Sequence, residues 1–122
     1  MTDASAEAPQ AIVASLSALL SGSTADPEPI EVIAGEPDRQ YAEFVDAGLE
    51  AGAWTATTGR WQESPQSTPE VAYITKGHIR LHPTDGEPVD VVAGDLLYVP
   101  VGWAGTWEIV EDVEKIYVVL PE

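Results

Sequence analysis

From Trp54 to Leu120, apolar and polar residues alternate in short runs, and turn residues interrupt the pattern about every 8 to 12 positions. This spacing is typical of an antiparallel β-sandwich or barrel. Gly77 is expected to break a strand, and Asp85-Gly86 to form a hairpin turn. No helical pattern appears after Gly48. We expect strands at about residues 52–58, 70–76, 78–83, 88–92, 96–99, 104–110 and 113–120.

A different pattern occupies the N-terminal part. Ile12, Leu16, Leu19 and Leu20 repeat at helical spacing, which predicts a helix over residues 11–20. Pro9 near the start and Gly22 after the end fit the usual helix signals. We expect this helix to pack on the domain or on a second subunit, with a membrane-binding or partner-binding helix as the alternative.

Between the helix and the strands, the organisation is less regular. Residues 21–29 are rich in Ser, Pro and acidic residues and predict a linker, and residues 30–33 alternate like a short edge strand. Residues 41–48 fit either a helical turn or an irregular arm. The expected organisation is therefore an N-terminal helix and linker over residues 1–29, followed by an all-β barrel over residues 30–122.

Charge and composition exclude several classes of function. The 122 residues predict one domain, and 21 acidic against 5 basic residues give a net charge of −16. Such a surface repels phosphate backbones and anionic lipids, which argues against nucleic-acid and membrane binding. The absence of cysteine excludes disulfides, zinc–thiolate sites and thiol nucleophiles.

Location also follows from the first residues. The apolar run at residues 11–20 is too short to span a bilayer. The segment before it carries two acidic residues and no basic one, unlike a secretory signal. A cytoplasmic protein is therefore expected.

Two glycine- and proline-containing spacings resemble a known family. Six residues separate Glu70 from Gly77, and Gly94 is followed by Pro100 and Gly102. These spacings resemble the two motifs of the cupin superfamily, whose members form a small double-stranded β-helix barrel of jelly-roll type. The segments 101–108 and 114–118 further resemble the ureidoglycine aminohydrolase-like single-domain cupins. The resemblance covers about residues 50–120, and it implies a barrel wide enough for one small ligand.

The resemblance also indicates what this chain lacks. Metal-binding cupins carry histidines before the first-motif glutamate and after the second-motif glycine. The positions that match hold Ser64 and Gln66, or Glu63 and Pro65, and then Gly105. Of the four ligands only Glu70 is present, and one carboxylate does not hold a divalent metal against water. We therefore expect no metal and no cofactor.

His78 and His82 do not replace the missing ligands. If Glu70 points inward, strand alternation directs Ala72 and Ile74 inward as well, and across the turn expected at Gly77 the apolar pair Ile79 and Leu81 should line the interior. The two histidines then share the opposite face with Arg80. That polar stripe is expected to face solvent or a subunit; a surface metal site or a pH-sensitive contact are the alternatives.

Glu70 is the candidate catalytic residue. Burial disfavours the charged form of a carboxyl group unless a cation or hydrogen-bond donors hold it. A carboxyl group in an apolar barrel suits general acid or base chemistry near neutral pH. A glutamate paired to a nearby base, or one left in water at the rim, is the structural alternative.

The other candidate site residues are aromatic or basic. Aromatic walls beside one carboxylate suit an apolar, aromatic or cationic ligand. The resemblance implies a tyrosine and a lysine near the end of the barrel in contact with substrate. Core filling and surface ion pairs are the structural alternatives for these side chains. The candidates for substrate binding are Trp61, Trp107, Tyr98, Tyr117, Arg60 and Lys115.

Together these features predict a metal-independent cupin that binds a small organic molecule. An isomerase, lyase, cyclase or decarboxylase fits one acid/base group without redox chemistry. A non-catalytic metabolite-binding or structural dimerisation cupin is the alternative. The resemblance also implies a homodimer.

Overall fold

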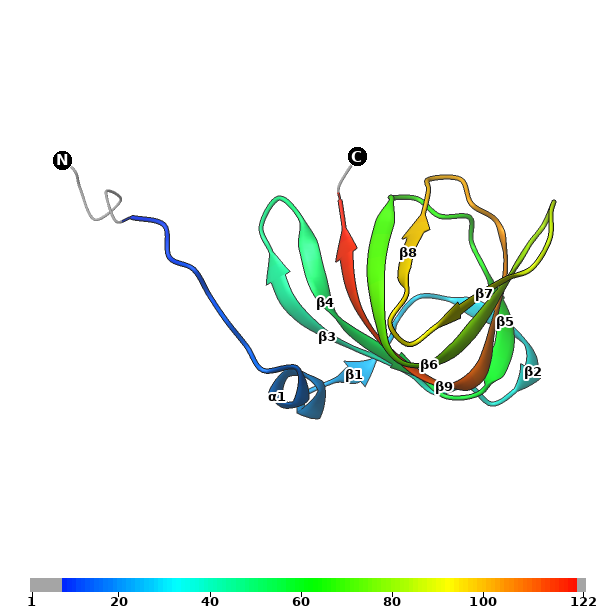
Figure 1. Cartoon of the computed structure of the whole chain (residues 1–122), viewed down its shortest axis with the longest axis horizontal. Coiled ribbons are helices and arrows are strands. Elements are labelled where there is room, and N and C mark those ends of the chain that lie inside the picture. Colours follow the sequence, from blue (N-terminus) through cyan, green and yellow to red (C-terminus); the bar gives the residue numbers. More distant parts are fainter. Residues whose placement is uncertain (1–7, 121–122) are drawn as a thin grey trace.

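Two long antiparallel strands organise the computed structural model, which describes residues 8–120. Strand β6 (Glu70–Pro83) pairs with strand β9 (Gly105–Val119) from one end to the other. Glu70 lies opposite Val119 at one end, and Pro83 lies opposite Gly105 at the other. Both strands curve strongly, and the remaining strands add to their edges (Figure 1). The result is a curled antiparallel sheet that forms a small cupin-type barrel, as the sequence predicts.

The shorter strands complete the barrel on both sides of this pair. On one side the order is β1-β3-β4-β9-β5-β2, and on the other side β6 pairs with β7 and β8. Their bounds are β1 (Thr24–Ala25), β2 (Ile30–Gly35), β3 (Arg39–Asp46), β4 (Glu50–Ala56), β5 (Gly59–Glu63), β7 (Val89–Val92) and β8 (Leu96–Val99).

Strand alternation places the core as predicted. On β6, Ile79 and Leu81 are buried, whereas His78, Arg80 and His82 lie on the outer face. The outer three side chains bind carboxylates of neighbouring strands rather than the interior. The core is therefore apolar and aromatic, with most of its large side chains contributed by β4, β5, β6 and β9.

The sequence predicts that Gly77 ends a strand, but the structure shows that it does not. Strand β6 continues through it, although the register against β9 shifts between Ile74 and Ile79. Gly77 has φ +91°, and a Cβ there would collide with the backbone of Asp112 and Val113. The glycine therefore lets two strands approach closely at a bulge, which bends the strand without ending it.

The N-terminal helix is shorter than predicted. Helix α1 spans only Leu16–Ser21, and residues 8–15 are extended chain that leads away from the barrel (Figure 1). Ser15 caps the helix because its hydroxyl accepts from the Ala18 N–H at 3.2 Å. The β-branched residues before this cap favour extended backbone, which explains the late start. Residues 1–7, included in the predicted first segment, lie outside the described residues.

Two segments without a clear pattern are strands in the structure. Residues 41–48 overlap β3 rather than a helical turn or an irregular arm, and the predicted linker at 21–29 contains β1. Strand β1 pairs with β3, and Asp26 directly after it binds the Arg39 guanidinium at 3.0 Å. The segment predicted as a linker is therefore part of the barrel wall. Within residues 8–120, no helix is long and apolar enough to cross a membrane.

Candidate functional site

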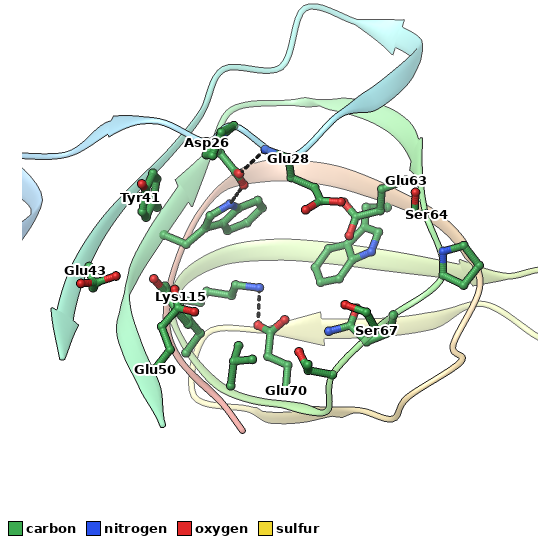
Figure 2. A pocket seen from close by; sticks show the side chains of 18 residues that line it. Asp26, Glu28, Tyr41, Glu43, Glu50, Glu63, Ser64, Ser67, Glu70 and Lys115 are labelled. Atoms are coloured by element: carbon green, nitrogen blue, oxygen red, sulfur yellow. Dashed lines mark hydrogen bonds and ion pairs between the residues drawn. The ribbon is translucent and has the colours of Figure 1, made fainter. Parts of the chain in front are cut away.

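One end of the barrel contains a cavity of about 360 Å³. Its wall is formed by the inner faces of β3, β4 and β9, by the start of β6, and by the two loop segments 26–28 and 63–68 (Figure 2). The acidic, basic and aromatic side chains that line it are Asp26, Glu28, Tyr41, Glu43, Glu50, Trp54, Glu63, Glu70, Trp107, Lys115 and Tyr117.

A buried ion pair lies on the wall of this cavity. The Lys115 ammonium donates to Oε2 of Glu70 at 2.6 Å, and the two residues are 5% and 8% exposed. Figure 2 shows the two side chains, which come from the paired strands β6 and β9, pointing toward each other. Strand alternation on β9 directs Val113, Lys115 and Tyr117 inward together, so the lysine has no route to the outer surface. The cation that Glu70 needs is thus supplied by the chain itself.

Two indole rings enclose the same ammonium group. Lys115 Nζ lies 4.5 Å from the centre of the Trp54 ring and 4.8 Å from that of Trp107. The rings pack edge to face with their centres 6.1 Å apart. The Trp54 Nε1–H donates to Oδ2 of Asp26 at 2.9 Å, which fixes the ring. Glu70 and the two π faces therefore stabilise the ammonium group together.

Further carboxylates surround the cavity. Burial raises the pKa of Glu63, although its Oε2 accepts from Trp61 Nε1–H at 2.8 Å. Burial and the nearby charges of Glu43 and Asp46 raise the pKa of Glu50. In both cases burial is the largest cause, and neighbouring carboxylates raise the pKa further.

Tyr117 adds a hydroxyl group to the wall. Burial, and then the charge of Glu50, raise the pKa of the Tyr117 phenol well above its usual range. The hydroxyl therefore stays protonated at neutral pH and is able to donate a hydrogen bond. Its ring lies close against Gly52, where a Cβ would come within 2.7 Å of the hydroxyl oxygen.

The structure brings four of the seven predicted site residues together. Glu70, Trp107, Tyr117 and Lys115 line the cavity. For Lys115 the structural alternative was a surface ion pair. The structure instead places this lysine in the interior.

The other three predicted residues lie outside the cavity lining. Trp61 is fully buried in the core, and Arg60 donates to the Thr106 hydroxyl at 3.0 Å. Tyr98 is 63% exposed, because it lies between the buried residues Leu97 and Val99 and therefore points to the opposite face of β8.

Several cavity residues were not found from the sequence. Tyr41 and Glu43 share the inner face of β3, and Glu50 and Trp54 share that of β4. Tyr41 and Glu43 were missed because residues 41–48 were not predicted as a strand, and pairing of β3 with β4 then places Tyr41 opposite Trp54. Asp26 had no such signal, since it follows a two-residue strand in the predicted linker.

The two histidines lie outside the barrel interior. His78 Nε2 lies 2.7 Å from Asp90 Oδ1, and His82 Nε2 lies 2.7 Å from Glu108 Oε1. Hydrogen bonds from His78 and Arg80 lower the pKa of Asp90. Among residues 8–120, no group of three or more His, Cys, Asp or Glu side chains is placed to hold a metal ion.

Comparison with protein families gives one match that covers most of the barrel. Residues 46–117 match the model of the EutQ-like cupin domain. Among the curated proteins compared with the chain, none matches it significantly.

Solved structures of similar fold come from several bacteria. The Clostridium difficile EutQ protein is 18% identical, with a TM-score of 0.63 and coverage of 70% of each chain. A DUF861-family protein of unknown function from Pseudomonas syringae is 23% identical with a TM-score of 0.67, and the match covers 80% of this chain and 43% of that one. A DUF861-family protein from Thermotoga maritima is 28% identical with a TM-score of 0.51, over 53% of this chain and 73% of that one.

Proposed function

Because the chain belongs to the EutQ-like cupin family, we propose that its barrel binds a small organic molecule, that Glu70 transfers a proton to or from it, and that Lys115 stabilises the charge that develops. One observation carries this proposal. The two side chains form a buried pair, with 2.6 Å between Nζ and Oε2, on the wall of an open cavity.

A contribution to folding stability does not explain why this ion pair is buried. Removing two charges from water costs several kcal/mol per ion, and apolar residues of similar size often stabilise a protein as well or better. An ion pair next to an accessible cavity is therefore better explained by its chemistry. This argument supports a role in binding or proton transfer.

The arrangement suits acid/base chemistry on one small molecule. The Glu70 carboxylate would accept a proton from the bound molecule, and the Lys115 ammonium would stabilise the negative charge that develops. Tyr117 lies on the same wall and would donate a hydrogen bond to the same charge. An isomerisation, elimination, cyclisation or decarboxylation needs no more than these groups. A cavity that only binds a metabolite is the alternative.

The test compares two glutamates that each bind a basic side chain. The purified protein is incubated with a mixture of small metabolites, and bound and converted compounds are identified by mass spectrometry. Glu70→Gln should abolish turnover and keep binding. Glu108→Gln is the matched control, because Glu108 binds His82 on the outer face of the barrel. Unchanged turnover in Glu70→Gln would refute proton transfer by Glu70; bound but unconverted metabolites in the unmodified protein would support the binding-only alternative.

We also propose that this chemistry is independent of a metal. The proposed loss of the metal ligands rests on the resemblance to metal-binding cupins. Where those cupins carry a histidine after the second-motif glycine, this chain has Gly105. Gly105 cannot be exchanged for a histidine without disruption, because a Cβ there would collide with the backbone of His82 and Pro83. Elemental analysis of the purified protein checks the proposal, and one equivalent of a transition metal would contradict it.

A second proposal concerns a homodimer. Five exposed apolar residues cover the outer side of β8, β6 and β9, and we call this set the outer apolar face: Val71, Tyr73, Leu96, Tyr98 and Ile116. Strand register makes them neighbours, since Val71 lies opposite Tyr98 and Tyr73 lies opposite Leu96 and Ile116. No carboxylate is among them, although the chain carries 21.

A second copy of the chain is the occupant that these features favour. Two molecules that each carry a charge of −16 repel each other unless they meet on an uncharged surface. The outer apolar face continues to a small hollow of about 140 Å³ lined by Ile116, Phe44 and Leu16 of helix α1. The helix would then extend the same interface.

Sedimentation equilibrium tests the dimer. The unmodified chain should have twice the mass of a monomer, and Leu96→Glu should shift it to the monomer. Val89→Glu is the control, since Val89 is also an exposed apolar strand residue but lies on β7. A monomeric unmodified chain, or a Leu96→Glu variant that remains dimeric, would contradict the proposal.

A further inference from the structure

We infer that the cavity is selective for a small organic ammonium ion. This inference rests on the proposed function, because it assumes that the barrel binds a small molecule. It adds the chemical class of that molecule, which follows from the charges and aromatic faces of the wall.

The wall of the cavity carries more acidic than basic side chains. Its basic side chain, Lys115, is already paired with Glu70, and Asp26 is paired with Arg39 at 3.0 Å. The remaining carboxylates of the wall have no basic partner within the described part of the chain: Glu28, Glu43, Glu50 and Glu63. Figure 2 shows Glu43 and Glu50 on one side of the cavity and Glu28 and Glu63 on another. An anionic ligand would meet repulsion from both directions.

The pKa values of Glu50 and Glu63 are raised, first of all because the two carboxyl groups are removed from water. Burial and neighbouring carboxylates disfavour their charged forms. A bound cation would stabilise these carboxylates, so part of the cost of burying them would be recovered when the ligand enters.

The wall already holds one cation between aromatic rings and a carboxylate. The Lys115 ammonium lies over the rings of Trp54 and Trp107, with a carboxylate at hydrogen-bond distance. Tyr41 and Tyr117 add two more aromatic rings toward the unpaired acids. Aromatic rings combined with carboxylates are the usual means by which proteins bind organic ammonium groups.

A tryptophan of the cavity wall has a buried hydrogen-bond donor without a partner. The Nε1–H of Trp107 is buried and has no hydrogen-bond partner, and the Trp107 side chain lines the cavity. A buried donor without a partner costs free energy and calls for an explanation such as a bound molecule. Because this nitrogen has almost no surface open to the cavity, a hydroxyl or carbonyl oxygen beside the ammonium group of a ligand would become its acceptor after the indole ring turns.

Size limits the class further. A volume of about 360 Å³ is near the lower end of ligand sites and holds a metabolite of up to about a dozen non-hydrogen atoms, at about 30 Å³ for each water-sized group. The expected ligands are therefore small amino alcohols and related ammonium compounds.

Three probes of nearly equal shape isolate the effect of charge. These are choline, its neutral isostere 3,3-dimethylbutan-1-ol and the anion 3,3-dimethylbutanoate. Each is titrated at millimolar concentration into the full chain at low salt, and the indole N–H signals of the four tryptophans are followed by NMR. Choline should shift the signals of Trp54 and Trp107. The neutral isostere should bind about tenfold more weakly, as expected when one charge-assisted contact is lost, and the anion should not bind.

Variants locate the effect in the cavity. Glu63→Gln and Glu50→Gln should each lower the affinity for choline by about three- to tenfold, the range expected for one partly buried charge pair. Glu87→Gln is the matched control, because Glu87 is exposed next to the Asp85-Gly86 turn and lies outside the cavity. The cavity variants should remain folded, since the change removes a carboxylate whose charged form is disfavoured.

Several results would overturn the inference. Equal binding of the neutral isostere or the anion would remove the selectivity for a cation, while binding of any probe in the cavity would leave the proposed function intact. Failure of all three probes would also refute the inference. The proposed function would then be judged by the metabolite mixture, which does not depend on ligand charge.

Discussion

Lys115 shows how the environment of one side chain follows from its neighbours. It has buried residues two positions away on either side of it on β9, so its ammonium group enters the barrel. There it meets Glu70 and the faces of two indole rings. Each of these contacts offsets part of the cost of burying the charge. The pair is therefore interdependent, because truncating the side chain of one member to an apolar one leaves the charge of the other without its partner.

A first prediction concerns this interdependence. Lys115→Met should destabilise the protein by about 3–5 kcal/mol, because Glu70 would be left as an unpaired buried charge. The double variant Lys115→Met, Glu70→Met should recover most of that loss, since neither charge remains. Urea unfolding of both variants measures the difference. A double variant as unstable as Lys115→Met would show that the ion pair itself contributes the stability.

A second prediction concerns Glu63 and pH. Its pKa is higher in the folded protein than in the unfolded chain, so the folded state binds more protons. The stabilising effect of its protonation is complete below the ordinary pKa of 4.5 and is lost as the pH rises through the raised value. Glu63→Gln should therefore raise Tm at neutral pH, with a gain on the order of 1 kcal/mol or less, and reduce the dependence of Tm on pH. Glu87→Gln serves as the control, and an unchanged pH profile for Glu63→Gln would contradict the prediction.

At the scale of elements, the bulge in β6 determines the shape of the barrel. The register of β6 against β9 shifts at three places between Ile74 and Ile79, and both strands bend there. Gly77 permits the bend through its positive φ and its missing side chain. Because β6 and β9 contribute to both halves of the barrel, this one position controls how the halves meet.

A third prediction separates backbone strain from steric collision at glycines. Gly94→Ala should cost about 1–2 kcal/mol, because φ is +95° but the space around it is open. Gly77→Ala has a similar φ and also forces a Cβ into the backbone of Asp112 and Val113, so its cost should exceed that of Gly94→Ala by about 1–3 kcal/mol. Chemical denaturation of both variants gives the comparison. Equal losses would mean that β6 and β9 move apart without cost.

At the scale of the whole molecule, charge opposes the compact state. A net charge of −16 on 122 residues creates repulsion across the surface as well as inside the cavity. The barrel is held against this repulsion by an apolar core with three tryptophans, Trp54, Trp61 and Trp107. Screening by salt should therefore act on stability as a whole.

A fourth prediction follows. Raising the ionic strength from about 0.01 M to about 0.15 M shortens the Debye length from about 30 Å to about 8 Å. Tm at neutral pH should rise by several degrees over this range, as measured by differential scanning calorimetry. The same change of salt near the isoelectric point, about 4.1, should have little effect. An equal rise at both pH values would assign the effect to something other than charge repulsion.

Local alternation along the chain was enough to specify the all-β barrel and to put Ile79 and Leu81 on one face of their strand and His78 and His82 on the other. These are properties of a two-residue period, which needs no knowledge of distant partners. The same local rules misplaced Gly77 as a strand break, because the bulge depends on how closely β9 approaches.

The composition of the cavity depended on contacts between distant segments. Glu70 and Lys115 are 45 positions apart, and the register places them opposite Val119 and Ile74, so that only their side chains meet, inside the barrel. Asp26 reaches Trp54 only because β1 pairs with β3. No local pattern contains this information, since strand pairing is set by burial of the whole barrel. The pairing therefore determined that the carboxylate predicted to lie alone among aromatic rings is bound to a lysine and surrounded by further acids.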